Sequence, residues 1–389
     1  MKAKTKFIKT ALAMAAMVAL LSACHRDSAI IEETDLQQFE LVWNELNDSY
    51  VFWAVDSTDW DAVYAKYRPL FENMDEEPYG VWQSTWKELS STLIDHHLEI
   101  DLVRPSNPIV ISGHGSLIHP GQDEVLGRDY ADNHIGSLTT IPTINEKVDM
   151  LDNIVGLGRL TDTIKSSFNN PNAQYSYSGV LEQKIAYISF SSFFDVQIDS
   201  IKAFEHFKQL VAKESIKAAI IDVRGNVGGD TKNLAAVLSC FTTDPILIGY
   251  SRAKTGVGRH DFTPEIPTIV TPLPAPQMKV IPIIVLTDIL SASMSESVAV
   301  AIRQLPQGYV IGERTFGARG LLVKKIKGNH HVITLSNEIF IDAGGMIEGY
   351  GVEPDIKCLF DKNLWNSGID NQLEMAVSVA LDKILESGN

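Results

Sequence analysis

A short apolar run that ends in a serine cluster constrains the fold more than any other part of the chain. Residues 281–286 are apolar, residues 287–296 read Thr-Asp-Ile-Leu-Ser-Ala-Ser-Met-Ser-Glu, and residues 298–305 have helical amphipathic spacing. This order predicts a buried strand that delivers serines to the first turn of a helix, where backbone N–H groups are available. A serine there can attack a carbonyl group while adjacent amides stabilise the oxyanion. The same serines could instead be helix caps and turn residues, which is the commoner role.

A second apolar run leads into a glycine-rich turn. Residues 218–223 predict another buried strand, residues 224–230 read Arg-Gly-Asn-Val-Gly-Gly-Asp, and a helix is expected over 233–238. Glycines let the backbone approach a ligand and leave amides free to donate. A phosphate cradle is not supported, because the spacing fits neither the Walker A motif nor the dinucleotide fingerprint. An ordinary strand-to-helix turn is the remaining alternative.

Together the two segments resemble a serine peptidase family that includes the carboxy-terminal processing proteases, the tricorn protease core and the interphotoreceptor retinoid-binding repeats. Residues 222–229 are similar to the family's Asp-Leu-Arg-Gly-Asn-Gly-Gly-Gly, with Val227 in place of the first of three glycines. Residues 291–296 resemble Ser-Ala-Ser-Ala-Ser-Glu, whose middle serine, here Ser293, is the nucleophile. Residues 310–317 match the family's Val-Gly-Glu-x-Thr-x-Gly stretch. The resemblance implies an α/β fold with a crotonase-like core.

One departure from the family pattern bears on the mechanism. The processing proteases carry a lysine general base after Thr-x-Gly, but this chain has Ala318 there, followed by Arg319. A guanidinium group cannot be deprotonated near neutral pH, so a Ser-Lys dyad is not expected at this place. Lys324 and Lys325 lie a few residues further on, in what reads as an outgoing strand, and remain candidates for a displaced base.

The tricorn-like branch of the family uses histidine as its base, and matching residues are present here. Residues 89–97 resemble its Leu-x-Asp-Gly-His element, with His97 on the histidine and His96 in place of a small residue. Residues 347–355 resemble Glu-x-x-Gly-Val-x-Pro-Asp, which implies that Glu348 completes the site. Imidazole suits proton transfer near neutral pH. A zinc site on the two histidines is disfavoured, because sequence neighbours project differently and no third ligand has recognisable spacing.

The resemblance therefore implies a serine endopeptidase acting on a peptide or protein substrate, without metal or organic cofactor. Its expected residues are the catalytic Ser293, His97 and Glu348, the oxyanion-hole amides of Gly228 and Met294, and the supporting His96 and Gly229. A non-catalytic protein that binds peptides or lipophilic ligands on the same scaffold is the alternative. An acyl-CoA enzyme of the crotonase type is a weaker alternative, because that chemistry is cytoplasmic and this chain is expected to be exported.

The first residues predict export. Lysines within residues 2–9 precede an apolar segment over 11–21, and Leu-Ser-Ala-Cys at 21–24 resembles a bacterial lipobox. Residues 1–23 are thus expected to be a lipoprotein signal peptide, with Cys24 lipidated and anchoring the protein to the cell envelope. His25 does not resemble the aspartate that retains lipoproteins at the inner membrane, so the outer membrane is expected. Secretion without a lipid is the alternative.

The net charge disfavours one class of partner, and the cysteine content excludes a disulfide scaffold. The chain has a net charge of −16, and removal of a signal peptide with four lysines leaves about −20, which disfavours nucleic acid as a partner. Cys240 and Cys358 are too few for a disulfide scaffold, and the sequence leaves their pairing open, as it does the oligomeric state.

The remaining chain divides into three expected parts. Residues 24–105 carry aromatic residues at helical spacing and predict a helical bundle. Residues 106–178 show little periodicity and predict an irregular insertion of unknown fold, without the glycine signatures of a PDZ domain; His114, His119 and His134 are interpreted as surface residues. Residues 179–389 alternate strands and helices, including helices over 201–211 and 372–385, and are expected to form the peptidase domain.

Overall fold

The structure is a computed structural model that describes residues 33–106, 116–118, 142–167, 175–193, 197–275, 280–345 and 348–387. Its centre is a seven-stranded sheet with the strand order β13-β10-β9-β6-β5-β4-β3. The five strands from β13 to β5 are parallel, and β4 and β3 continue the sheet antiparallel. The parallel arrangement puts the carboxyl ends of β6 and β9 at the same edge, which is where ligands bind in open α/β sheets.

The elements of this body have the following bounds. The strands are β3 Leu160–Ser167, β4 Tyr175–Leu181, β5 Ile185–Phe190, β6 Ala218–Asp222, β9 Ile283–Thr287, β10 Gly308–Gly312 and β13 Ile356–Lys357. The helices are α6 Ile144–Gly156, α7 Lys202–Ala212, α8 Asn233–Leu238, α9 Met294–Arg303, α10 Lys362–Asn366 and α11 Asn371–Glu386, with a 3-10 turn η4 at Ile198–Ser200.

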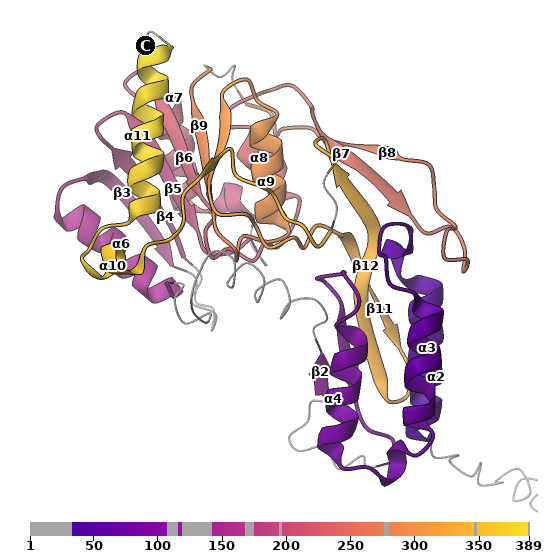
Figure 1. The fold of residues 1–389 in the computed structure, drawn as a ribbon. Coiled ribbons are helices and arrows are strands. Elements are labelled where there is room, and N and C mark those ends of the chain that lie inside the picture. The colour runs from indigo at the N-terminus through magenta and orange to yellow at the C-terminus, as the bar shows by residue number, and fades with distance from the viewer. Residues whose placement is uncertain are drawn as a thin grey trace, which may run out of the picture.

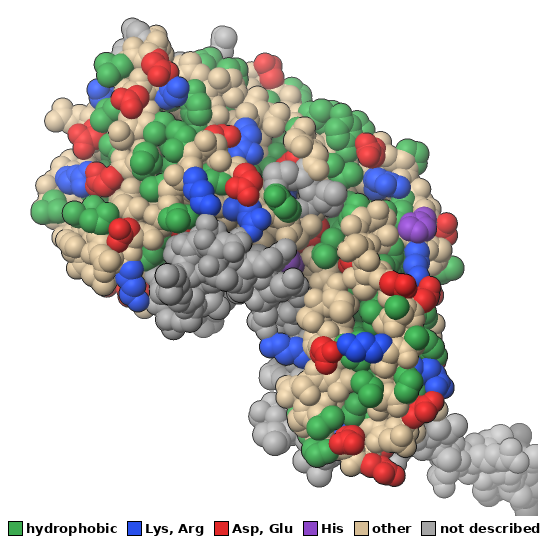
Figure 2. Space-filling view, in the orientation of Figure 1, with side chains coloured by type: hydrophobic (Ala, Val, Ile, Leu, Met, Phe, Trp, Pro, Cys, Tyr) green, Lys and Arg blue, Asp and Glu red, His purple; other side chains and the backbone are tan. Residues whose placement is uncertain are grey.

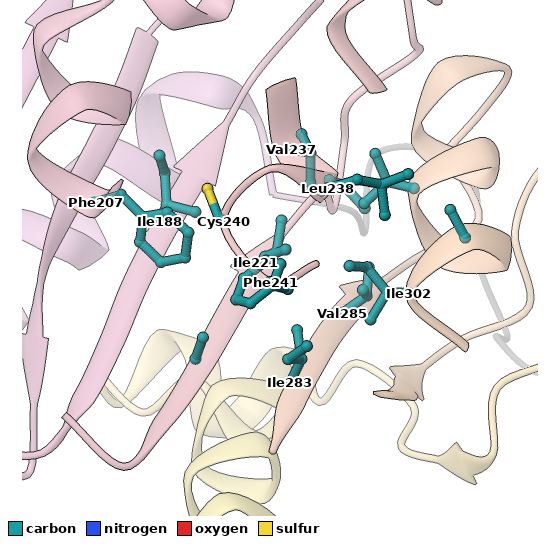
Figure 3. Packing of buried hydrophobic residues seen from close by; sticks show 14 of the residues in the cluster. Ile188, Phe207, Ile221, Val237, Leu238, Cys240, Phe241, Ile283, Val285 and Ile302 are labelled. Carbon is teal, nitrogen blue, oxygen red and sulfur yellow. The ribbon is translucent and has the colours of Figure 1, made fainter. Parts of the chain in front are cut away.

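Two separate cores cover the two faces of this sheet. Side chains alternate between the faces of a strand, so Ile221 of β6 joins the core under α7, α8 and α9, while Ile220 joins the core under α6 and α11. Figure 3 shows the first core, with Val285 of β9 beside Ile302 of α9. Strands buried on both faces read as continuous apolar runs, which is why the sequence predicted β6 and β9 correctly.

A second sheet lies beside this body and carries the N-terminal helices (Figure 1). Its strand order is β2-β1-β12-β7-β8, and β11 also pairs with β12. The strands are β1 Glu99–Leu102, β2 Ser116–Ile118, β7 Ile246–Ala253, β8 Ile266–Val270, β11 Leu321–Lys327 and β12 His331–Asp342. The helices are α2 Asp35–Ser49, α3 Trp60–Phe71 and α4 Tyr79–Ser90, with 3-10 turns η1 Val51–Ala54 and η2 Met74–Glu76.

The expected domain boundaries need correction. The N-terminal helices are present, but they do not form a bundle of their own, because their core includes Ile333, Leu335 and Ile339 of β12. The described residues 142–167 and 175–178 are not irregular, since they form α6, β3 and the first part of β4. β3 is rich in threonine, serine and charge, which hid its periodicity. The second sheet also takes β7, β8, β11 and β12 out of the stretch expected to be one domain.

Several expectations concern residues outside the described ranges. These are the signal peptide, Cys24, and the histidines at 114, 119 and 134. The remaining cysteines do not pair: Cys240 and Cys358 are free, and they belong to the cores on opposite faces of the sheet. Burial raises the pKa of the Cys240 thiol to about 12. Within the described ranges no helix combines the length and apolarity needed to cross a membrane. Figure 2 shows basic side chains interspersed with acidic ones over one face.

The shared core gives a stability prediction. Ile333 is fully buried between β12 and the N-terminal helices, whereas its neighbour Val332 is only half-buried. Ile333→Ala should lower the free energy of unfolding by about 2–5 kcal/mol through lost burial and a cavity, and Val332→Ala by about 1 kcal/mol or less. Urea unfolding followed by tryptophan fluorescence measures both. Equal effects of the two substitutions would mean that the helices do not depend on β12.

Candidate functional site

Ser293 stands at the N-cap of α9, directly after the loop that leaves β9. Its φ is 53° and its ψ is −113°, a conformation that costs a non-glycine residue on the order of 1–3 kcal/mol and clusters at functional sites. Strained strand-to-helix turns of this kind present the nucleophilic serine in other hydrolases. The Ser293 N–H donates to Glu296 Oε2 at 2.9 Å, which helps to hold the turn.

The other two serines of the loop have structural roles. Ser291 is fully buried and its Oγ donates to the carbonyl of Val223 at 2.9 Å. Ser295 is also fully buried and its Oγ donates to the carbonyl of Asn226 at 2.8 Å. Both therefore fasten the serine loop to the glycine turn, and Ser293 is the one left partly exposed.

The glycine turn lies directly against Ser293, as the sequence predicted. A Cβ added to Gly228 would lie 2.7 Å from Ser293 Cβ and 2.9 Å from the Met294 nitrogen. Gly228 and Gly229 have φ of 99° and 142°, in the region that favours glycine. A side chain at position 228 would therefore clash with the serine loop at Ser293 and Met294, which explains the glycine there. Val227, the departure from the family pattern, is half exposed.

The two amides expected to form the oxyanion hole differ in this structure. The Met294 N–H belongs to the first turn of α9, whose amides have no partner within the helix. The Gly228 N–H instead donates to Asn226 Oδ1 at 2.9 Å. The orientation of that side-chain amide is fixed, because Asn226 Nδ2 donates to the Phe190 carbonyl at 3.0 Å. Gly228 is thus at the expected place, but its N–H is engaged within its own turn.

The expected base lies in a second cluster, built from the segment before β1, from β12 and from the turn after it. His97 Nδ1 lies 3.5 Å from Ser336 Oγ and 3.9 Å from Glu348 Oε1. Asp95 is fully buried and accepts from the His97 N–H at 2.9 Å and from Ser336 Oγ at 2.9 Å. The His97 side chain is 18% exposed. Its Nδ1 side is therefore surrounded by oxygen atoms, which leaves Nε2 as the nitrogen directed away from them.

Glu348 acts as an acceptor for three backbone amides. Its Oε1 accepts from the His96 N–H at 3.1 Å, and its Oε2 accepts from the Gly320 N–H at 2.6 Å and from the Arg319 N–H. Burial, reinforced by the nearby carboxylates of Asp95 and Glu296, raises the pKa of Glu348 well above its ordinary value.

The place of the missing lysine contains nothing that can act as a base. Ala318 is buried, and the Arg319 guanidinium pairs with Asp342 at 2.6 Å. Lys324 and Lys325 are paired in register with Leu335 and Thr334 across the β11–β12 ladder. In the described ranges neither lysine has a hydrogen bond or ion pair to Ser293.

His96 and His97 point in different directions, as expected for neighbours. The His96 ring packs edge-on against Phe316, with ring centroids 5.1 Å apart. The Phe316 N–H donates to the Ser291 carbonyl at 3.0 Å, so His96 contacts a residue bound to the serine loop. The two imidazole rings therefore have different neighbours.

The segment between β10 and β11 joins the serine cluster to the histidine cluster. Glu296 Oε1 accepts hydrogen bonds from Thr315 Oγ1 at 2.6 Å and from the Gly317 N–H at 2.9 Å. The N–H groups of Arg319 and Gly320, two and three residues after Gly317, donate to Glu348 instead. Glu296 is fully buried, and burial raises its pKa. Among the described residues no hydrogen bond joins Ser293 Oγ directly to His97.

Buried charged residues form ion pairs and hydrogen bonds that hold the glycine turn and the serine loop in place. Arg224 pairs with Asp222 at 2.6 Å and with Asp370, the N-cap of α11, at 2.7 Å, and all three are buried. Asp288 Oδ1 accepts from the Gly225 N–H at 2.8 Å and from Ser291 Oγ at 3.2 Å, and so joins the two loops. Only the Asp-Val-Arg of the quoted motif signalled part of this network.

Two missed residues belong to the histidine cluster. Asp95 falls on the aspartate of the Leu-x-Asp-Gly-His element, so the motif contained a signal for it. Ser336 lies in the middle of β12, 239 residues from His97, and nothing in its surrounding sequence indicated a role.

Comparison with known proteins agrees with the geometry. Peptidase family S41 matches residues 184–358, and the tricorn protease C1 domain matches residues 32–77. An inferred tricorn protease homologue of Streptomyces coelicolor is 30% identical over 178 residues, which are 45% of this chain and 14% of the relative. The carboxy-terminal processing protease CtpB of Bacillus subtilis is 28% identical over 176 residues, 44% of this chain and 33% of the relative.

A solved structure shows the same fold over nearly the whole chain. An inferred peptidase of Parabacteroides merdae superposes with a TM-score of 0.68 at 24% identity, covering 89% of this chain and 96% of that one. The chain spans a third or less of the two sequence relatives, so their activities describe longer proteins. The matches confirm the resemblance of this chain to the carboxy-terminal processing and tricorn proteases.

The buried carboxylates give a prediction for the pH dependence of stability. Above the ordinary pKa of 4.5 the unfolded chain has released the Glu348 proton, while the folded protein still holds it. The folded state then binds more protons, so the free energy of unfolding falls as the pH rises from 4.5 towards the raised pKa. Glu348→Gln cannot titrate and should reduce this slope by up to about 1.4 kcal/mol per pH unit.

Urea unfolding between pH 4.5 and 8 measures the slopes. Glu353→Gln provides the control, because Glu353 is an exposed glutamate near the same turn. An unchanged slope in Glu348→Gln would show that Glu348 is ionised in the folded protein throughout this range.

Proposed function

We propose that this chain is a serine endopeptidase in which Ser293 is the nucleophile and His97 the general base. One observation carries the proposal: of three serines in the loop, only Ser293 is released from structural hydrogen bonding to a buried carbonyl, and it is held at positive φ against Gly228. A serine that served only as a helix cap needs no such strain. The substrate is a peptide or a protein, in keeping with the S41 domain.

The proposed proton path runs through His97. A proton on Nδ1 is stabilised by Ser336 Oγ and Glu348, which leaves the Nε2 lone pair to accept the Ser293 proton during attack. The same nitrogen then returns the proton to the leaving amine. Asp95 holds the His97 backbone and Ser336 together, so Asp95 and Ser336 are positioning residues. The reaction needs no metal or organic cofactor.

The oxyanion is proposed to bind the Met294 N–H and the Gly228 N–H. The second donor must first leave Asn226 Oδ1. Two consecutive glycines at positive φ allow that peptide to rotate at small cost. An oxyanion offers a charged acceptor, which forms a stronger hydrogen bond than the neutral Asn226 amide. Substrate binding therefore completes the hole.

A binding protein without catalysis is the second candidate. It is favoured by the engaged Gly228 N–H and by the absence, in the described part of the chain, of a hydrogen bond between Ser293 and His97. Catalytic hydrogen bonds are often long in unliganded enzymes and tighten with substrate. We therefore place the peptidase first.

Localisation is part of the proposal. Lipidation of Cys24 after removal of residues 1–23 would anchor the protein in the bacterial cell envelope, with the outer membrane as the expected site. We also propose that the seven-stranded sheet with helices on both faces is a crotonase-like core, as the family resemblance implies.

A fluorophosphonate probe tests the nucleophile. The wild-type protein should react covalently, and Ser293→Ala should abolish labelling and peptide hydrolysis while the melting temperature stays within a few degrees. Ser297→Ala is a matched control on the same helix. Labelling of Ser293→Ala at the wild-type level would move the nucleophile elsewhere or indicate a binding protein.

The same assays identify the base. His97→Ala should reduce the rate by roughly 10²- to 10⁴-fold, as is usual for the loss of general acid–base help, whereas Lys324→Ala and Lys325→Ala should retain activity. Near-full activity of His97→Ala with loss in either lysine variant would restore a Ser-Lys mechanism.

The anchor is tested by fractionation. Cys24→Ser should release the protein from the membrane fraction or leave it unprocessed, because a diacyl-modified cysteine is the anchor that the sequence offers. Mass spectrometry that found an unmodified mature amino terminus in the wild type would contradict lipidation.

A further inference from the structure

The residues around the proposed base also have the composition and spacing of a metal site. One ligand atom each from Asp95, His97 and Glu348 lies within 4.8 Å of the other two. Ligands of a tetrahedral zinc ion, with bonds of about 2.0–2.2 Å, are roughly 3.4 Å apart. The distance of 3.9 Å between His97 Nδ1 and Glu348 Oε1 needs only a small contraction to reach that value.

The carboxylates retain lone pairs for a cation. Glu348 Oε1 accepts one backbone N–H, from His96, and Asp95 Oδ2 accepts one, from Ser336. A carboxylate oxygen can accept about two donors, so each of these oxygens keeps one free position. The backbone amides also fix both carboxylates in orientation, as outer-shell partners do around bound metals.

The local charge favours a cation as well. Asp95, Glu296 and Glu348 are buried close together, and the Arg319 guanidinium beside them is already paired with Asp342 at 2.6 Å. Buried carboxylates in excess of buried cations must take up protons or metal ions. A divalent ion would neutralise this excess of negative charge more effectively than one proton.

We propose that Asp95, His97 and Glu348 bind a divalent transition-metal ion, Zn²⁺ above all, and that this ion reversibly inhibits the enzyme. One imidazole with two carboxylates suits zinc, whereas Ca²⁺ and Mg²⁺ require more oxygen ligands. Metal on Nδ1 leaves the remaining imidazole proton on Nε2, which then has no lone pair to accept the Ser293 proton. The inhibitory half rests on the proposed function, while metal binding stands without it.

Binding is tested first, independently of activity. Isothermal titration of the full-length Ser293→Ala protein, freed of metal, with ZnCl₂ should give one site with a dissociation constant in the micromolar range or tighter. Asp95→Asn, His97→Ala and Glu348→Gln should each weaken it at least tenfold. His206→Gln is the matched control, because His206 is a buried histidine bonded to Ser178 in another part of the fold. Far-ultraviolet circular dichroism confirms folding of each variant.

Inhibition is tested on the wild type. Zn²⁺ at the concentrations that saturate binding should abolish peptide hydrolysis, EDTA should restore it, and Mg²⁺ or Ca²⁺ should have no effect. Absence of zinc binding, or binding that is equally tight in Asp95→Asn, His97→Ala and Glu348→Gln, overturns the site. Binding at the site with unchanged or increased hydrolysis overturns the inhibition. If the protein has no peptidase activity at all, the titration still decides the site, and the failure is that of the proposed function.

Discussion

Parallel pairing of β6 with β9 is the constraint on which the rest of the site depends. The register runs from Ala219 opposite Ile283 to Asp222 opposite Leu286, so both strands end at the same level. The glycine turn and the serine loop must then meet at one edge, and their contact is so close that Gly228 has no room for a side chain. Ser291, Ser295 and Asp288 fasten the two loops by hydrogen bonds. The strain at Ser293 is supported by these contacts.

Two glutamates organise the remaining half of the site through backbone amides. Glu296 accepts hydrogen bonds from the backbone N–H groups of Ser293 and Gly317. Glu348 accepts hydrogen bonds from the backbone N–H groups of Arg319, Gly320 and His96. The chain segment that holds a lysine in related peptidases is here held between two carboxylates. Burial raises the pKa of both glutamates, and in our proposal zinc can bind one of them.

The sequence predicted the elements whose burial is uniform and missed those whose residues are mixed. β6, β9 and the helices at 202–212 and 371–386 were foreseen, because continuous apolar runs and helical spacing are local signals. Ser293, Gly228, Met294, His97 and Glu348 were placed through family motifs. Ser336 was missed because a serine in a long strand carries no signal, and the engagement of Gly228 with Asn226 depends on a peptide orientation that no motif encodes. The N-terminal helices were expected to share a core only with one another. Helical spacing shows that a face is buried but not which element covers it, and here β12 covers it.

Ser293 and His97 are held by different sheets, and this has a mechanical consequence. Ser293 follows β9 of the seven-stranded sheet, whereas His97 is held by Ser336 of β12, in the middle of the antiparallel sheet. Each residue is fastened through buried hydrogen bonds within its own cluster. A small change in the angle between the sheets therefore alters the distance between Ser293 and His97 while leaving these hydrogen bonds intact. The N-terminal helices share a core with β12, so a force on them would reach His97 through that strand.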